Sequence, residues 1–191
     1  MSSTTIDLFR HGETINGSGF RGSIDDALTK EGEQQMWQAV EKAPHQWDQI
    51  ISSPLQRCAF FARKFSQQHA LPLTLEARLK EMHFGLWEGQ TATVLMERDA
   101  DALSKFWQDP LANTPPEAEP LRDFEQRILS AWQEITARYE GKKILLVTHG
   151  GVIRLLLCHI LQRSVNHLLE FEVKHAAIER IVITDKQARR L

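Results

Sequence analysis

The segment KKILLVTHGGVIRLLLCHIL, residues 142–161, constrains the fold more than any other part of the chain. Residues 144–147 form a short apolar run typical of a buried strand, and Gly150-Gly151 turns the chain into a predicted helix over 152–161. A strand that passes directly into a helix is the unit from which helix-covered parallel sheets are built. The segment is no membrane span, because it contains Arg154 and His159 and falls short of the about 20 apolar residues required.

The rest of the chain repeats this alternation of strand and helix. Further strands are predicted at 5–9, 49–52, 73–75, 171–173 and 178–183, and helices at 29–43, 54–68, 91–98, 102–107 and 121–139. We expect one domain over residues 1–191, an α/β protein folded as a three-layer α/β/α sandwich with a mostly parallel central sheet. Ligands of such sheets bind beyond the carboxyl ends of the strands.

Two predicted strands end in the same way. The first ends in FRHG and the later one in THGG, so each delivers a histidine, His11 or His149, into a glycine turn. Neighbouring parallel strands lie about 4.8 Å apart. If these two are neighbours, the histidines face one another at the carboxyl edge of the sheet. Arg10 stands beside His11 and needs an anion or a carboxylate, since burying an unpaired guanidinium is costly.

A second arginine, Arg57, follows the segment SSPLQ at another predicted strand-to-helix junction. Two arginines and two histidines at one edge indicate a phosphate pocket. The helix N-termini after Pro54 and at Gly150 are expected to add backbone donors and a positive dipole.

Other chemistries find little support. The sequence has no zinc-type histidine pair, no cysteine pair at ligand spacing, no phosphate-binding Walker loop and no dinucleotide fingerprint, so we expect no metal and no cofactor. The net charge of −2 provides no basic field for nucleic acid. The first ten residues do not resemble a signal peptide, and a cytoplasmic protein without a membrane partner is the default expectation.

The irregular segment LKEMHFGLWEG, residues 79–89, holds two acids, Glu81 and Glu88. A glutamate among Met82, Phe84 and Trp87 is a candidate proton donor, because partial desolvation favours its neutral form. The alternative is a surface loop with solvated acids, and we favour that interpretation for Glu88.

The motifs RHGET, SSPLQR, LKEMHFGLWEG and VTHGG, in that order, resemble the histidine phosphatase superfamily in its phosphoglycerate-mutase-like branch. The resemblance runs from Ile6 to about Ile183 and implies a phosphoglycerate-mutase-like fold. It also implies roles. His11 matches the nucleophile that becomes phosphohistidine, Arg10 and Arg57 match the phosphoryl-holding arginines, His149 matches the second histidine of the pocket, and Glu81 matches the acid that protonates the leaving oxygen. A nucleophilic His11 must be neutral, so we expect one ring nitrogen to donate to a backbone carbonyl and both arginines to disfavour its charged form. The arginines and His149 are expected to supply positive charge in place of a metal.

The resemblance is weaker in two loops. Only Ile15 separates Thr14 from Asn16, one residue fewer than usual in the family, so Asn16 and Gly17 are alternatives for a phosphate-contacting position. Arg21 falls near another such position. We also expect a small cap-like insertion at about 88–120, which ends in the proline-rich segment DPLANTPPEAEP.

The resemblance implies a metal-independent phosphomonoesterase acting on a small phosphorylated metabolite. Within the family, the small bacterial alpha-ribazole-5'-phosphate phosphatases are most similar, which suggests alpha-ribazole 5'-phosphate, from assembly of the cobalamin lower ligand, as a substrate. A cofactor-dependent phosphoglycerate mutase is the alternative enzyme. A catalytically silent phosphate-binding or interaction module is the alternative of another class, against which all five expected catalytic residues are present.

Overall fold

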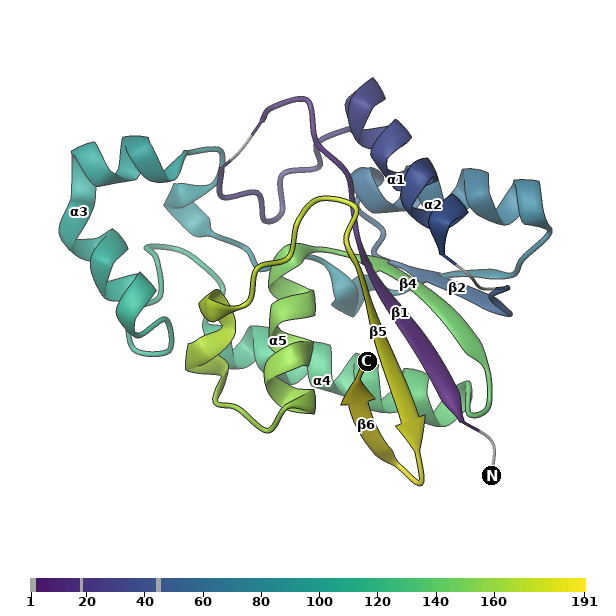
Figure 1. Cartoon of the computed structure of the whole chain (residues 1–191). Helices are drawn as coiled ribbons and strands as arrows, with labels where there is room; N and C mark the ends of the chain where they lie inside the picture. Colours follow the sequence, from purple (N-terminus) through teal and green to yellow (C-terminus); the bar gives the residue numbers. More distant parts are fainter. Residues whose placement is uncertain (1–2, 18, 44–45) are drawn as a thin grey trace.

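The computed structural model describes residues 3–17, 19–43 and 46–191, and these form one six-stranded sheet (Figure 1). The strands are β1 (Thr4–Arg10), β2 (Gln49–Ser52), β3 (Leu73–Leu75), β4 (Lys143–Thr148), β5 (Ile178–Thr184) and β6 (Gln187–Arg190), in the order β3-β2-β4-β1-β5-β6. The first four are parallel, whereas β5 runs antiparallel to β1 and β6 antiparallel to β5. The predicted mostly parallel sheet is confirmed.

Helices cover both faces of the sheet. They are α1 (Lys30–Lys42), α2 (Gln56–His69), α3 (Ala92–Gln108), α4 (Leu121–Arg138) and α5 (Gly150–Ile160), with short 3₁₀ turns at Ala77–Leu79, Gly85–Trp87 and Val165–Glu170. In Figure 1, α4 and α5 lie on one side of the strands and α1 and α2 on the other. The predicted three-layer sandwich is therefore confirmed. Across the residues that the structure describes, no helix has both the length and the apolar character needed to cross a bilayer.

A hydrophobic core lies on each face of the sheet, because side chains alternate between the two faces along the central strands. Successive side chains of a strand point to opposite faces of the sheet. Ile6 and Leu8 of β1 therefore pack with α4 and α5, whereas Phe9 packs with α1 and α2. All three side chains are fully buried. Helices therefore pack on both faces of the sheet close to the carboxyl ends of β1 and β4.

Near the C-terminus one predicted strand is wrong and one strand was missed. Residues 171–173 are not a strand; instead the carbonyl of Val173 accepts a 2.6 Å hydrogen bond from Arg10, so this segment crosses the end of the sheet. Strand β6 was not predicted, because QARR has no apolar alternation and its turn has no glycine. Asp185 and Lys186 supply that turn with φ values of 52° and 65°, which hairpin turns usually obtain from glycine or asparagine.

The helices predicted at 91–98 and 102–107 are joined into α3 across a break. Asp99 has a non-helical backbone with φ of −154°, and its carboxylate accepts from the amide of Ala102 as the cap of the second part. This helix lies beside the sheet rather than on either face (Figure 1). It packs through a small core of its own, in which Leu95, Leu103 and Phe106 surround Trp87.

Candidate active site

The two histidine-bearing turns lie side by side at the carboxyl edge of the sheet. Strands β1 and β4 pair in parallel with Arg10 opposite Thr148, so the next residue of each strand, His11 and His149, leaves the sheet at the same level. Their ring centroids are 5.3 Å apart. The adjacency predicted from FRHG and THGG is confirmed.

The imidazole of His11 is held as a neutral base. Its Nδ1 lies 2.8 Å from the carbonyl oxygen of Gly12. Because a carbonyl can only accept, Nδ1 carries the proton and Nε2 keeps a lone pair. Burial lowers the pKa of His11 well below its ordinary value, and the positive charges of Arg57 and Arg10 lower it further. Both predictions for this side chain, its tautomer and the effect of the arginines, are confirmed.

Backbone contact explains the glycine that follows His11. A Cβ on Gly12 would lie 2.0 Å from the carbonyl oxygen of Gly32 in the first turn of α1. A Cβ on Gly32 would in turn lie 2.1 Å from the carbonyl oxygen of Glu13. The loop after β1 therefore rests directly on the start of α1. Glycine at 32 weakens a helix in isolation, but here it permits this close approach.

His149 is neutral, which corrects the expectation that it supplies positive charge. The Nε–H of Arg57 donates to His149 Nδ1 over 3.2 Å, so that nitrogen must hold a lone pair. The proton therefore resides on Nε2, which donates to the hydroxyl of Ser53 over 2.7 Å. Complete burial, followed by the charge of Arg57, keeps the pKa of His149 well below its ordinary value. Among the described residues around this site, the side chains that carry positive charge are those of arginines.

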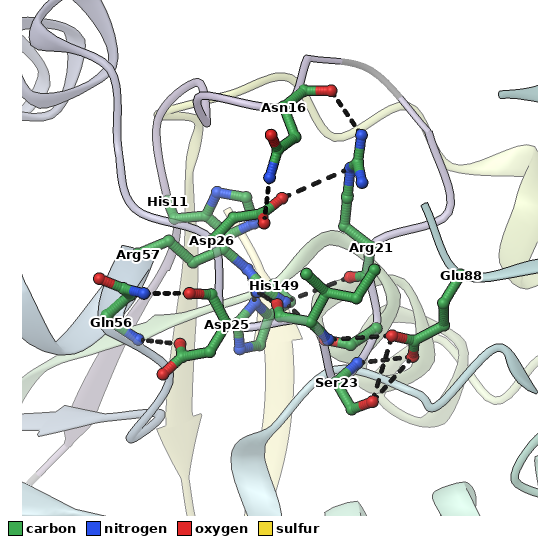
Figure 2. Close-up of polar contacts among 12 residues, drawn as sticks. His11, Asn16, Arg21, Ser23, Asp25, Asp26, Gln56, Arg57, Glu88 and His149 are labelled. Atoms are coloured by element: carbon green, nitrogen blue, oxygen red, sulfur yellow. Dashed lines mark hydrogen bonds and ion pairs between the residues drawn. The ribbon is translucent and has the colours of Figure 1, made fainter. Parts of the chain in front are cut away.

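Arg57 is completely buried and is held by main-chain carbonyls (Figure 2). Its two Nη groups donate to the carbonyls of Arg21, Gly22 and Ile24 over 2.6 to 3.2 Å. Glu88 secures this segment by accepting from the amides of Ser23 and Ile24. Glu88 is thus a structural residue rather than a solvated one. Arg57 and His149 lie behind His11 and have no exposed surface.

Glu81 is fixed on the N-terminus of α5. Its Oε2 accepts from the amide of Gly151 over 2.9 Å, and a Cβ on Gly151 would lie 2.3 Å from its Oε1. Arg127 of α4 holds the backbone of the loop by donating to the carbonyls of Lys80 and Glu81, and Glu119 pairs with Arg127 at 2.6 Å. Glu81 is therefore positioned from both its side chain and its backbone.

The three predicted substrate-binding residues have different surroundings. Gly150 and Arg21 border the cavity described below, whereas Asn16 is exposed and donates its amide to Asp26 over 2.6 Å. Arg21 Nε lies 3.5 Å from Asp26, so one buried carboxylate organises both side chains (Figure 2). The α2 N-terminus was expected to face the pocket, but its Gln56 amide is occupied by the carboxylate of Asp25. The α5 N-terminus alone of these two borders the cavity.

A cavity of about 260 Å³ joins these groups. One end is polar and contains Arg10, His11, Glu81, Arg154 and His175, and the other end is largely apolar. The apolar wall consists of Phe20, Met82, Phe84, Phe106, Trp107, Leu121, Phe124, Leu168 and Leu169. Hollows of about 530 and 860 Å³ lie elsewhere on the surface, but neither contains an arginine. The described residues contain no group of three or more histidine, cysteine, aspartate or glutamate side chains arranged to hold a metal ion.

Two residues of the polar end were missed by the sequence reasoning. Arg154 is one helical turn after Gly150 on α5, and this i,i+4 spacing could have identified it as sharing the face that borders the edge of the sheet. His175 precedes β5, and its ring centroid is 5.8 Å from that of His11. Nothing local identifies His175, because its position depends on β5 running antiparallel and starting at this edge.

A helix-covered α/β sheet that gathers a neutral histidine, arginines and a glutamate at its carboxyl edge is suited to binding a phosphoryl group. Comparison with known proteins gives the family. Residues 6–191 match the histidine phosphatase superfamily (branch 1), and the chain belongs to that family.

Individual relatives agree with this assignment. The chain is 30% identical to the adenosylcobalamin/alpha-ribazole phosphatase of Escherichia coli, over 95% of this chain and 91% of the relative. It is 28% identical to the putative phosphoserine phosphatase 2 of Hydrogenobacter thermophilus, over 91% and 87%. The solved alpha-ribazole phosphatase of Shigella flexneri superposes with a TM-score of 0.85 at 27% identity, covering 98% of this chain and 94% of that one. The protein is therefore a phosphatase with a phosphoglycerate-mutase-like fold.

Proposed function

We propose that this phosphatase is a metal-independent phosphomonoesterase that acts on a small phosphorylated metabolite through a phosphohistidine at His11. The observation that carries the proposal is the state of His11. It is a buried, neutral imidazole whose Nδ1 is engaged by the carbonyl of Gly12, which leaves Nε2 as the nucleophile beside Arg10 and Glu81. A nucleophile of this kind divides a slow hydrolysis into two faster steps.

In the first step, His11 Nε2 attacks phosphorus while the ester P–O bond breaks. Protonated Glu81 gives its proton to the leaving oxygen, and the alcohol departs. In the second step, water attacks the phosphohistidine and passes a proton to Glu81. The P–N bond then breaks, which releases phosphate and regenerates neutral His11. Apart from the attacking water, every acid, base and nucleophile in this sequence belongs to the chain itself, and we propose no step on a metal.

Arginine charge stabilises the phosphoryl group in both steps. Catalysis of phosphoryl transfer consists mainly of positioning and electrostatic stabilisation. Arg10 borders the cavity, and its Nε is buried without a hydrogen-bond partner in the described structure, which suits a phosphoryl oxygen. Arg57 adds positive charge from behind His11, and His149 holds Arg57 in place. Arg21 and the α5 N-terminus at Gly150 are the remaining candidates for phosphoryl contacts, with Asn16 acting through Asp26.

The segment at about 88–120 acts in this proposal as a small cap over the leaving group. Phe106 and Trp107 of α3 contribute to the apolar wall of the cavity. Trp107 is 44% exposed, so its face is accessible to an organic group. A cap of this size admits water, which favours hydrolysis over return of the phosphoryl group. Alpha-ribazole 5'-phosphate and phosphoserine are the first substrates to test, because relatives are named for them.

The test begins with release of phosphate from p-nitrophenyl phosphate. The wild type is expected to release it, and His11→Ala is expected to lose this activity while retaining its unfolding midpoint. His159→Ala, which removes a surface histidine of α5, is the matched control. Rapid quenching in alkali should trap a phosphoryl group on the wild type and not on His11→Ala, and later treatment with acid should release it.

Two experimental outcomes would contradict this proposal and favour a different function. Equal inertness of the wild type and His11→Ala across a broad panel of phosphomonoesters would favour a silent binding module. Efficient interconversion of phosphoglycerates without release of phosphate would favour a mutase.

A further inference from the structure

Two guanidinium groups occupy the same part of the cavity. The Nη1 of Arg154 and the Nε of Arg10 lie 3.3 and 3.4 Å from the point that a Cβ on Gly150 would occupy. Glycine at this position leaves the space between them open. Burial lowers the pKa of Arg10 to about 10, even though Glu81 raises it, and the nearby positive charges of Arg154 and Arg57 contribute to the decrease. Like charges at such proximity favour an anion between or beside them.

Arg154 has no acidic partner of its own. Its Nε donates to the carbonyl of Phe171 over 2.8 Å, which fixes the plane of the guanidinium, and it forms no salt bridge with any described residue. Two other arginines near the site have carboxylate partners, since Arg21 pairs with Asp26 and Arg127 with Glu119. An oriented guanidinium that borders a cavity without a carboxylate partner is suited to a carboxylate or phosphate of a ligand.

The charge balance of the reaction leaves Arg154 in excess. A phosphomonoester carries a charge of about −2 near neutral pH. Arg10 and Arg57 balance that charge once Glu81 carries the proton that it donates. Arg154 then contributes one further positive charge, which an additional anionic group on the leaving alcohol would match.

His175 adds a neutral donor to the same end of the cavity. His175 is exposed on one side, but partial burial of its ring, with the charge of Arg10 next, lowers its pKa to about 4, so its imidazole is uncharged near neutral pH. A neutral imidazole can donate one N–H to an oxygen without adding charge.

We propose that Arg154, assisted by His175, forms a second anion subsite that binds a carboxylate close to the ester oxygen of the substrate. This inference rests on the proposed function and narrows it to phosphorylated hydroxy acids. Alpha-ribazole 5'-phosphate has no such group, so it would use only the phosphoryl end and the aromatic wall. The other possibility, that Arg154 binds the phosphoryl group itself, predicts equal effects on all phosphomonoesters.

Two pairs of compounds differ only in the carboxylate. One pair is 3-phosphoglycerate and glycerol 3-phosphate, and the other is O-phospho-L-serine and O-phosphoethanolamine. In at least one pair, kcat/KM for phosphate release by the wild type should favour the carboxylate at least about tenfold, as expected for a charge-assisted contact. Arg154→Met should reduce that ratio to near one. Arg63→Met, which removes an exposed arginine of α2 with no described partner, should retain it.

A binding experiment separates this inference from the proposed reaction. Calorimetric titration of His11→Ala with the same pairs measures carboxylate preference without turnover. A preference that disappears in the His11→Ala/Arg154→Met double variant supports the subsite even if the wild type hydrolyses nothing, an outcome that would refute only the proposed function. No preference in either pair, or an unchanged preference after loss of Arg154, overturns the subsite whatever the activity.

Discussion

Lowering the pH from 7.5 to 5.5 should destabilise this protein through its two buried histidines. His11 is 6% exposed and His149 is fully buried, and both have pKa values well below the ordinary 6.5, because burial and the charge of Arg57 exclude the charged form. The unfolded chain binds a proton at each histidine below pH 6.5, whereas the folded chain does not. The two histidines therefore do not lower the free energy of unfolding above about pH 7, and they lower it increasingly as the pH falls.

The magnitude follows from this difference in bound protons. At pH 5.5, a histidine with an unfolded pKa of 6.5 that stays neutral when folded lowers the free energy of unfolding by about 1.4 kcal/mol. The two histidines together lower it by about 3 kcal/mol. The lowered pKa of His175 also reduces stability as the pH falls, but His175 is exposed and solvent makes its contribution smaller. Paired carboxylates with lowered pKa values, such as Glu33 and Glu76, lose their contribution only at lower pH. The change in the free energy of unfolding between pH 7.5 and 5.5 therefore comes mainly from the histidines.

Urea unfolding at pH 7.5, 6.5 and 5.5, followed by tryptophan fluorescence, measures this dependence. The wild type should lose about 3 kcal/mol of unfolding free energy across the interval, and His11→Ala should lose about half as much. His149→Gln provides a second measurement of the same slope. Equal unfolding free energies of the wild type at pH 5.5 and 7.5 would refute the reasoning, because they would mean that both histidines accept protons in the folded protein.

Two substitutions test other parts of the structure. Gly151→Ala places a methyl group 2.3 Å from the Glu81 carboxylate, so kcat should fall at least about tenfold with a smaller change in KM and in the urea midpoint; an unchanged kcat would contradict the position of Glu81. Asp7→Ala removes a buried carboxylate that accepts from Trp47 at 2.9 Å and from Arg180 at 2.7 and 2.8 Å. It should cost about 3 kcal/mol in urea unfolding, and a loss below about 1 kcal/mol would contradict that role.

Much of the fold could be predicted because its signals are local. Residues 144–147 are apolar and followed by Gly150-Gly151, so a strand and a helix are specified within a few residues of each other. The apolar stripe of 121–139 predicted α4 almost to its ends, Leu121 and Arg138. The errors fell where long-range contacts decide the conformation. Residues 171–173 have strand-like composition, but Val173 instead binds Arg10, and β6 forms because β5 offers an unpaired edge.

The fold class, the family and the turns that carry His11 and His149 could be predicted from the sequence, because adjacent residues encode a strand, a turn and the group at its end. The sequence did not determine the charge state of His149, since that depends on Arg57, which is 92 residues away in the sequence. Nor did it place Arg154 beside Arg10, or His175 beside His11. Only the tertiary structure brings these groups together. Their distances and burial set their pKa values and the excess positive charge of the cavity, because both electrostatic attraction and desolvation depend on position in space rather than on order along the chain.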